Sequence, residues 1–143
     1  MNTNTSVPKK FKEKDISWYI IDASKGSLGR IATKVSFLLL GKNSTDFVYN
    51  QVPRTKVIVV NAKKVRLTGN KLQSKKYYRH SGYAGGLKER TVSYYLNKSP
   101  KFIIETAVKG MLPKNKLRDK ILKNLYIYED TNHPHKANIV KVN

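Results

Sequence analysis

A run near the middle of the chain combines cations, aromatic residues and glycines in a pattern that suits nucleic acid. It extends from Lys75 to Lys88 and reads KKYYRHSGYAGGLK. Lysine and arginine neutralise phosphates, aromatic rings stack on unpaired bases, and glycine lets the backbone approach a sugar-phosphate surface closely. The run therefore predicts a loop that binds nucleic acid, in which one of Tyr77 and Tyr78 packs on the protein core instead.

The charge of the whole chain supports a polyanionic partner. The 143 residues include 29 Lys plus Arg against 9 Asp plus Glu, a formal net charge of +20. Such a chain repels itself unless a polyanion neutralises it. From Phe47 to Lys88 there is no carboxylate, so this stretch is the expected electrostatic footprint. Charge alone permits DNA as well as RNA, so a DNA-compacting protein stays open at this point.

A second candidate site is the sequence GSLGR at Gly26–Arg30. It lies between an expected strand and an expected helix, where backbone N–H groups and the helix dipole favour an anion. The spacing is not that of a dinucleotide-binding or P-loop motif, and the acid-free middle of the chain offers no obvious magnesium ligand. Three interpretations stay open: a plain tight turn, an RNA phosphate contact, and the phosphate cradle of an enzyme acting on nucleotides.

Other kinds of chemistry find little support. His133 and His135 flank a proline, but with no cysteine in the chain and no acidic cluster nearby we predict no metal site. No serine is paired with a histidine and an orienting acid, so we predict no catalytic residue, cofactor or small-molecule substrate. The lack of cysteine is consistent with a reducing compartment. No apolar run approaches the roughly 20 residues of a membrane span, so we expect a soluble protein without a membrane partner.

The elements that must position these residues form an α/β pattern. Trp18–Ile21 predicts a strand, and apolar residues at helical spacing predict a helix of about 13 residues that starts at Leu28, with Ser27 as its cap and Gly41 closing it. Val57–Val60 is apolar on both faces, which is typical of a central strand covered on each side. Strand, helix, strand in this order predicts a mostly parallel sheet.

The second half of the chain continues the pattern. Val65–Thr68 predicts a short, half-exposed strand. Ser99-Pro100 predicts a helix start, and that helix stops before Pro113. A short helix around Leu117–Leu122 and a last strand at Leu125–Tyr128 complete the prediction. We expect a basic N-terminal arm (1–16), one α/β domain (17–130) and a C-terminal tail (131–143).

At this point the chain resembles a known family, the bacterial-type large-subunit ribosomal protein L thirteen, from about Trp18 to His135. The ordered motifs that carry the resemblance are Trp18-Tyr19 with Asp22-Ala23, Leu28-Gly29-Arg30 with Ala32-Thr33, Gly41-Lys42, Val59-Val60-Asn61-Ala62, Leu67-Thr68-Gly69-Asn70-Lys71, Tyr77-Tyr78 with His80-Ser81-Gly82, Gly85-Gly86-Leu87-Lys88, and Ala107 to Lys114.

The resemblance implies a three-layer α/β/α fold around a small, mostly parallel sheet. It also implies a structural role in the large ribosomal subunit, with binding of large-subunit rRNA, participation in early assembly, and contacts to neighbouring proteins such as those called L three and L twenty. By position, the RNA-facing surface would include the segments from Lys75 to Lys88 and from Lys109 to Lys120. The candidate RNA-binding residues are Lys63, Lys64, Lys71, Lys75, Lys76, Tyr78, Arg79, His80, Tyr83 and Lys88 in a first patch and Lys109, Lys114, Lys116 and Arg118 in a second.

The chain leaves the family pattern in two places. Val52–Lys56 replaces two acids and a glycine by a proline and two bases, and Lys136-Ala137-Asn138 replaces the usual continuation after His135. The conformation of both segments is left open. Lysine exceeds arginine and asparagine is abundant, which is typical of an AT-rich genome, and no transit peptide is recognisable in the first sixteen residues. We therefore expect a ribosome in the bacterial cytoplasm or in an organelle that encodes the protein itself.

Overall fold

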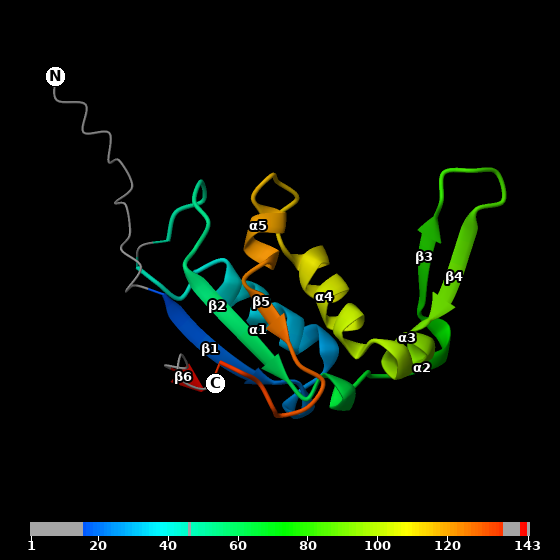
Figure 1. Cartoon of the computed structure of the whole chain (residues 1–143), viewed down its shortest axis with the longest axis horizontal. Helices are drawn as coiled ribbons and strands as arrows, with labels where there is room; N and C mark the ends of the chain where they lie inside the picture. The colour runs from blue at the N-terminus through cyan, green and yellow to red at the C-terminus, as the bar shows by residue number, and fades with distance from the viewer. Residues whose placement is uncertain (1–15, 46, 136–140, 143) are drawn as a thin grey trace, which may run out of the picture.

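A four-stranded parallel sheet forms the centre of the protein. The computed structural model describes residues 16–45, 47–135 and 141–142. The strands of the sheet are β1 (Ser17–Asp22), β2 (Thr55–Val60), β5 (Leu125–Ile127) and β6 (Lys141–Val142), in the order β5-β2-β1-β6. A separate antiparallel hairpin, β3 (Lys76–His80) and β4 (Leu87–Thr91), projects from the body of the molecule (Figure 1). The predicted α/β class with a small, mostly parallel sheet is confirmed.

Five α-helices and two short 3₁₀ helices connect the strands in the described part of the chain. They are η2 (Ala23–Lys25), α1 (Leu28–Leu39), η3 (Ala62–Lys64), α2 (Lys71–Ser74), α3 (Val92–Lys98), α4 (Pro100–Met111) and α5 (Arg118–Leu122). The predicted helix starts at Leu28 and Pro100 are confirmed. Ser27 and Ser99 stand at the cap positions, although neither side chain bonds a helix N–H group.

The main core lies between one face of the sheet and the helices. Val57 and Val59 of β2 are completely buried there against α1 and α4, which contribute Leu39, Ile103 and Ile104. Strand β2 lies between β1 and β5 and is buried on both faces, as its β-branched sequence predicts. The central sheet and α1 therefore form a rigid base for the loops at their ends.

The other face of the sheet is covered mainly by aromatic side chains. Trp18 of β1 stacks on Tyr126 with ring centroids 5.7 Å apart and lies 5.0 Å from the His135 ring, and the Lys56 ammonium lies 4.7 Å from the Trp18 ring centroid. Ile58 is completely buried beneath this cluster. Within the described residues, the third layer of the expected three-layer fold therefore consists of strand and loop side chains rather than helix.

Several segments differ from the predictions. Val65–Thr68 is not a strand: it makes one isolated bridge, between Ser27 and Arg66, because the chain turns there beneath the start of α1. The expected last strand is followed by β6, which lies in the predicted tail and pairs with β1. Helix α3 was not predicted. The arm, apart from Ile16, and residues 136–140 and 143 of the tail lie outside the described residues.

The segment that departs from the family pattern packs against the end of α1. Gly41 has φ +71°, and a Cβ atom added there would lie 3.0 Å from Pro53 Cβ. Asn124 Nδ2 donates a hydrogen bond of 3.3 Å to the Pro53 carbonyl oxygen. The turn before β2 is therefore held from two sides.

Replacing Gly41 by alanine should lower the free energy of unfolding by about 2 kcal/mol, since the left-handed backbone disfavours a side chain and the new Cβ meets Pro53. Gly69→Ala is the matched control: Gly69 has φ +65° but open space around its Cβ position, so backbone strain alone should cost about 1 kcal/mol. Urea denaturation measures the free energy of unfolding of both variants. Equal losses would show that the Pro53 contact contributes nothing.

Asp22, at the carboxyl end of β1, connects the segments that follow β1 and β2 by hydrogen bonds. Its Oδ1 accepts hydrogen bonds from Asn61 Nδ2 at 2.9 Å, Ser24 N at 2.9 Å and Ser24 Oγ at 2.8 Å. These bonds, that of Asn61 first, hold the pKa of Asp22 below its ordinary value of 3.8. Asn61 itself has φ 58°, a left-handed conformation that asparagine tolerates well.

Because folding lowers the pKa of Asp22, its contribution to stability should be fully present above the unfolded pKa, near 3.8, and lost as the pH falls through the folded value. Asp22→Asn should therefore flatten the decline in the free energy of unfolding below about pH 4. Urea denaturation of both proteins between pH 2.5 and 6 measures the difference. Parallel profiles would contradict the assignment.

A candidate nucleic-acid interface

The segment from Lys75 to Lys88, predicted as a loop, is mostly a β-hairpin. In the register of β3 and β4, Arg79 lies opposite Lys88, and Tyr77 lies opposite Arg90. Residues directly opposite in an antiparallel pair share a face, so Arg79, Lys88 and Arg90 lie on one face of the hairpin. We call these three residues the basic face. Like charges directly opposite each other destabilise a hairpin, so this arrangement suits a polyanion rather than the isolated protein.

The other face of the hairpin carries aromatic and apolar side chains in water. Tyr78 is 63% exposed and Leu87 is 59% exposed, and His80 lies opposite Leu87. Among the described residues, one ion pair lies on this face: Lys76 Nζ donates to Glu89 Oε1 at 2.9 Å, and this hydrogen bond raises the pKa of Lys76. The exposed rings are available for stacking on unpaired bases.

The tip of the hairpin is a glycine-rich turn. Gly82 and Gly85 have φ values of +90° and +71°, which a residue with a side chain rarely adopts. The Gly82 N–H donates to His80 Nδ1 at 2.9 Å, so the histidine side chain helps to shape the turn. Tyr83 stands at the tip and is 80% exposed. The hairpin tip therefore presents an exposed aromatic ring.

The base of the hairpin is fixed to the core by an aromatic cluster. Tyr77 makes edge-to-face contacts with Tyr95 of α3 and Phe102 of α4, with centroids 5.5 and 5.4 Å away. Burial raises the pKa of Tyr77. The prediction that one of the two adjacent tyrosines packs on the core is confirmed for Tyr77, and Tyr78 is the exposed one. The hairpin thus projects from a fixed root.

The remaining lysines of the first patch lie outside strands β3 and β4. Lys63 Nζ pairs with Glu129 Oε2 at 2.8 Å, and the hydrogen bond that Lys63 donates to Glu129 raises the pKa of Lys63. Its charge is therefore partly balanced within the protein. Lys64 follows it in η3 and is exposed. Lys71 and Lys75 line a pocket described below.

The second patch lies around the loop between α4 and α5. Lys114 and Lys116 are exposed on this loop, and Lys109, near the end of α4, lies 4.0 Å from Asp119. Arg118 begins α5 and is half-buried, with its Nε atom lacking a hydrogen-bond partner. In Figure 1 this loop and the hairpin both point toward the top of the view, on either side of α4. The two patches are therefore separate surfaces linked by that helix.

Sequence reasoning missed Arg90. It lies on the basic face, and its guanidinium carbon is 4.8 Å from the Tyr94 ring centroid. The expected footprint ended at Lys88 because Glu89 interrupts the acid-free stretch. The strand alternation that places Glu89 and Arg90 on opposite faces would have included Arg90, but it requires the hairpin to be recognised first.

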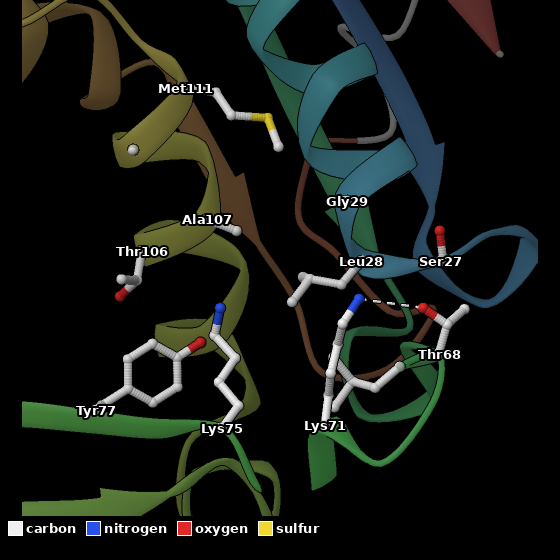
Figure 2. A pocket seen from close by; sticks show the side chains of 12 residues that line it. Ser27, Leu28, Gly29, Thr68, Lys71, Lys75, Tyr77, Thr106, Ala107 and Met111 are labelled. Atoms are coloured by element: carbon white, nitrogen blue, oxygen red, sulfur yellow. Dashed lines mark hydrogen bonds between the residues drawn. The ribbon is translucent and has the colours of Figure 1, made fainter.

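Three residues of the Gly26–Arg30 motif, Ser27, Leu28 and Gly29, form one wall of a pocket of about 400 Å³ (Figure 2). The other walls are the segment 67–71, the start of β3 and the second half of α4. Within the described residues no group of three potential metal-binding side chains occurs, and no helix there is long and apolar enough to cross a membrane.

Comparison with known proteins gives a consistent result. The family model described as Ribosomal protein L13 matches residues 16–134. Curated proteins named large ribosomal subunit protein uL13 are similar over nearly their whole length. That of Citrifermentans bemidjiense is 49% identical over 133 residues, covering 93% of each chain. That of Maridesulfovibrio salexigens is 45% identical, covering 92% of this chain and 94% of the relative, and that of Spiroplasma citri is 46% identical, covering 94% and 87%. The chain therefore belongs to the ribosomal protein L13 family.

Proposed function

We propose that this protein is a structural constituent of the large ribosomal subunit that binds large-subunit rRNA and supports early assembly of the subunit. The family to which it belongs is a structural, non-enzymatic part of the ribosome, in agreement with the expectation that the chain is not an enzyme. The relatives reported above are bacterial proteins named for the large subunit.

The observation that carries the RNA-binding part of the proposal is the basic face of the hairpin. Arg79 and Lys88 are opposed across the two strands, and no acid lies on that face among the described residues. A folded domain loses stability by such an arrangement, and a polyanion that neutralises the charges compensates for it. Each cation that contacts a phosphate releases condensed counterions, so binding becomes steeply dependent on salt.

The hairpin and the second patch suit different segments of rRNA. The hairpin extends away from the core, whereas α5 and the loop before it, which carry the second patch, lie beside α4 (Figure 1). A protein that holds two rRNA segments at fixed positions restricts their relative movement, which is the physical basis of a role in assembly. Recognition would rest on phosphate contacts and shape more than on base edges.

Neighbouring large-subunit proteins are the other proposed partners, and the ribosome is the proposed location. Bacterial cytoplasm and an organelle that encodes the protein itself both remain within this proposal. No small-molecule substrate, cofactor or membrane is part of it.

Sedimentation tests the proposal against a DNA-binding role. Cell extract is separated on a sucrose gradient in high salt, and the protein is followed by immunoblot. We expect it to remain with the large subunit, because many simultaneous contacts hold it there. Recovery with DNA, or in the unbound fraction while other large-subunit proteins stay bound, would contradict the proposal.

A further inference from the structure

The pocket of Figure 2 lies between the start of α1, the root of the hairpin and helix α4, next to Lys109 in the sequence of α4. It is open to the surface and is bounded by the first turn of α1, the root of the hairpin and the second half of α4. From the hairpin side come Lys75 and Tyr77, and from α4 come Thr106, Ala107, Gly110 and Met111. A strand of RNA running from the hairpin to Lys109 would pass over this opening.

The two cations of the pocket face its interior. Lys71 and Lys75 extend from the bottom of the view toward the space between α1 and α4 (Figure 2). Lys71 Nζ donates a hydrogen bond of 3.2 Å to Thr68 Oγ1, and Lys75 Nζ lies 5.7 Å from the Tyr77 ring centroid. None of the described residues that line the pocket is an acid. The cavity thus offers two positive charges to an anion without a competing carboxylate.

The remaining walls are apolar or carry uncharged polar groups. Leu28 is buried at the start of α1, and Leu67, Ala107 and Met111 add apolar surface, while Thr68 and Thr106 supply hydroxyl groups. Thr33 Oγ1 donates to Met111 Sδ at 3.6 Å, which connects α1 and α4 beside the pocket. A volume of about 400 Å³ falls in the range of small-ligand sites, roughly 300–1,000 Å³. Cations at one wall and apolar side chains at another match a phosphate joined to a base.

We propose that this pocket receives one unpaired nucleotide turned out of an RNA strand, with its phosphate between Lys71 and Lys75 and its base against the apolar wall of α1 and α4. The inference rests on the proposed function and deepens it: it makes the contact selective for single-stranded over duplex RNA. A paired base is disfavoured, because leaving the helix costs its stacking and pairing, about a few kcal/mol. Lys71 and Lys75 thereby gain a role distinct from that of the basic face.

Two glycines allow the pocket to be filled without changing its charge. Gly29 and Gly110 both line it, and a Cβ atom added at either position meets nothing within 4 Å. Leucine at Gly110 would occupy the cavity and also favour the helix, since glycine is a poor helix former. Asn97→Leu is the matched control, because Asn97 is an exposed, uncharged residue of α3 that does not line the pocket.

The experiment measures binding of the full-length protein to a mixed-sequence 12-nucleotide RNA, to the same strand in a duplex, and to adenosine monophosphate. We expect the wild type to prefer the single strand roughly tenfold, the increment of one well-placed base. Gly110→Leu should abolish this preference, while the salt dependence of RNA binding stays unchanged. Asn97→Leu should retain the preference. Melting temperatures at or above that of the wild type would show that Gly110→Leu is folded.

Other outcomes separate the two proposals. If the wild type binds RNA but shows no preference for the single strand, or if Gly110→Leu keeps that preference, the pocket inference is overturned and the proposed function stands. Micromolar binding of adenosine monophosphate would identify the occupant as a free nucleotide and would overturn the RNA assignment. Failure of the wild type to bind either RNA would contradict the proposed function and, with it, this inference.

Discussion

Replacing Arg79, Lys88 and Arg90 together by glutamine should weaken binding to large-subunit rRNA about a hundredfold at moderate salt. The three cations share one face of the hairpin, and a hydrogen bond to a phosphate is worth about 1 kcal/mol or more net. The slope of log affinity against log salt should become shallower by roughly 2 to 3, since each lost phosphate contact reduces it by about 0.7 to 0.9. Filter binding over a series of salt concentrations measures both quantities.

The same variant should fold as well as the wild type. Removing the opposed charges of Arg79 and Lys88 relieves repulsion, while losing the Arg90 contact with Tyr94 costs about 0.5–1 kcal/mol, so the free energy of unfolding should change by less than about 1 kcal/mol.

The matched control is the glutamine triple at Lys34, Lys42 and Lys101, which are exposed and lie outside both patches. It removes the same charge and should retain most of the affinity and slope. Equal losses in the two triples would show that net charge, rather than the hairpin, determines binding.

Trp18→Ala should have the largest effect on stability, a loss of about 3–5 kcal/mol in the free energy of unfolding. Trp18 is 9% exposed, and its ring contacts Tyr126, His135 and Lys56 on the second face of the sheet. Since a domain of this size is stable by roughly 5–15 kcal/mol, the variant should approach marginal stability. Hydrogen exchange should show the greatest loss of protection in residues 125–135.

Tyr126→Phe is the control for this prediction, because it keeps the stacked ring and removes only a hydroxyl group. It should cost less than about 1 kcal/mol. If Trp18→Ala lowered the free energy of unfolding as little as this control, the aromatic cluster would not stabilise the second face of the sheet.

The parallel core was predictable because local signals agree there. The apolar run Val57–Val60 and the helical spacing after Leu28 each indicate one element, and burial of the same residues supports it. The start of α4 was equally clear, since Pro100 lacks the N–H group that a helix interior needs. Short-range patterns therefore identified the elements that form the core.

The hairpin was not predictable by the same means. Its strands are exposed on both faces, so no apolar alternation marks them, and its glycines indicate only a turn. Residue types alone predicted Arg79 and Lys88 as candidate phosphate-binding residues, but the strand register was needed to add Arg90. The pocket could not be predicted from the sequence either, because its walls come from segments up to about 80 residues apart that only the fold brings together.

The most direct test of this account is ultraviolet cross-linking of protein to rRNA in purified large subunits, with the cross-linked residues identified by mass spectrometry. We predict cross-links concentrated in the hairpin, from Lys75 to Arg90, and in the second patch at Lys109–Arg118, with few at Lys34 or Lys101 on the outer surfaces of α1 and α4. Cross-links confined to those outer surfaces, and absent from the hairpin, would contradict it.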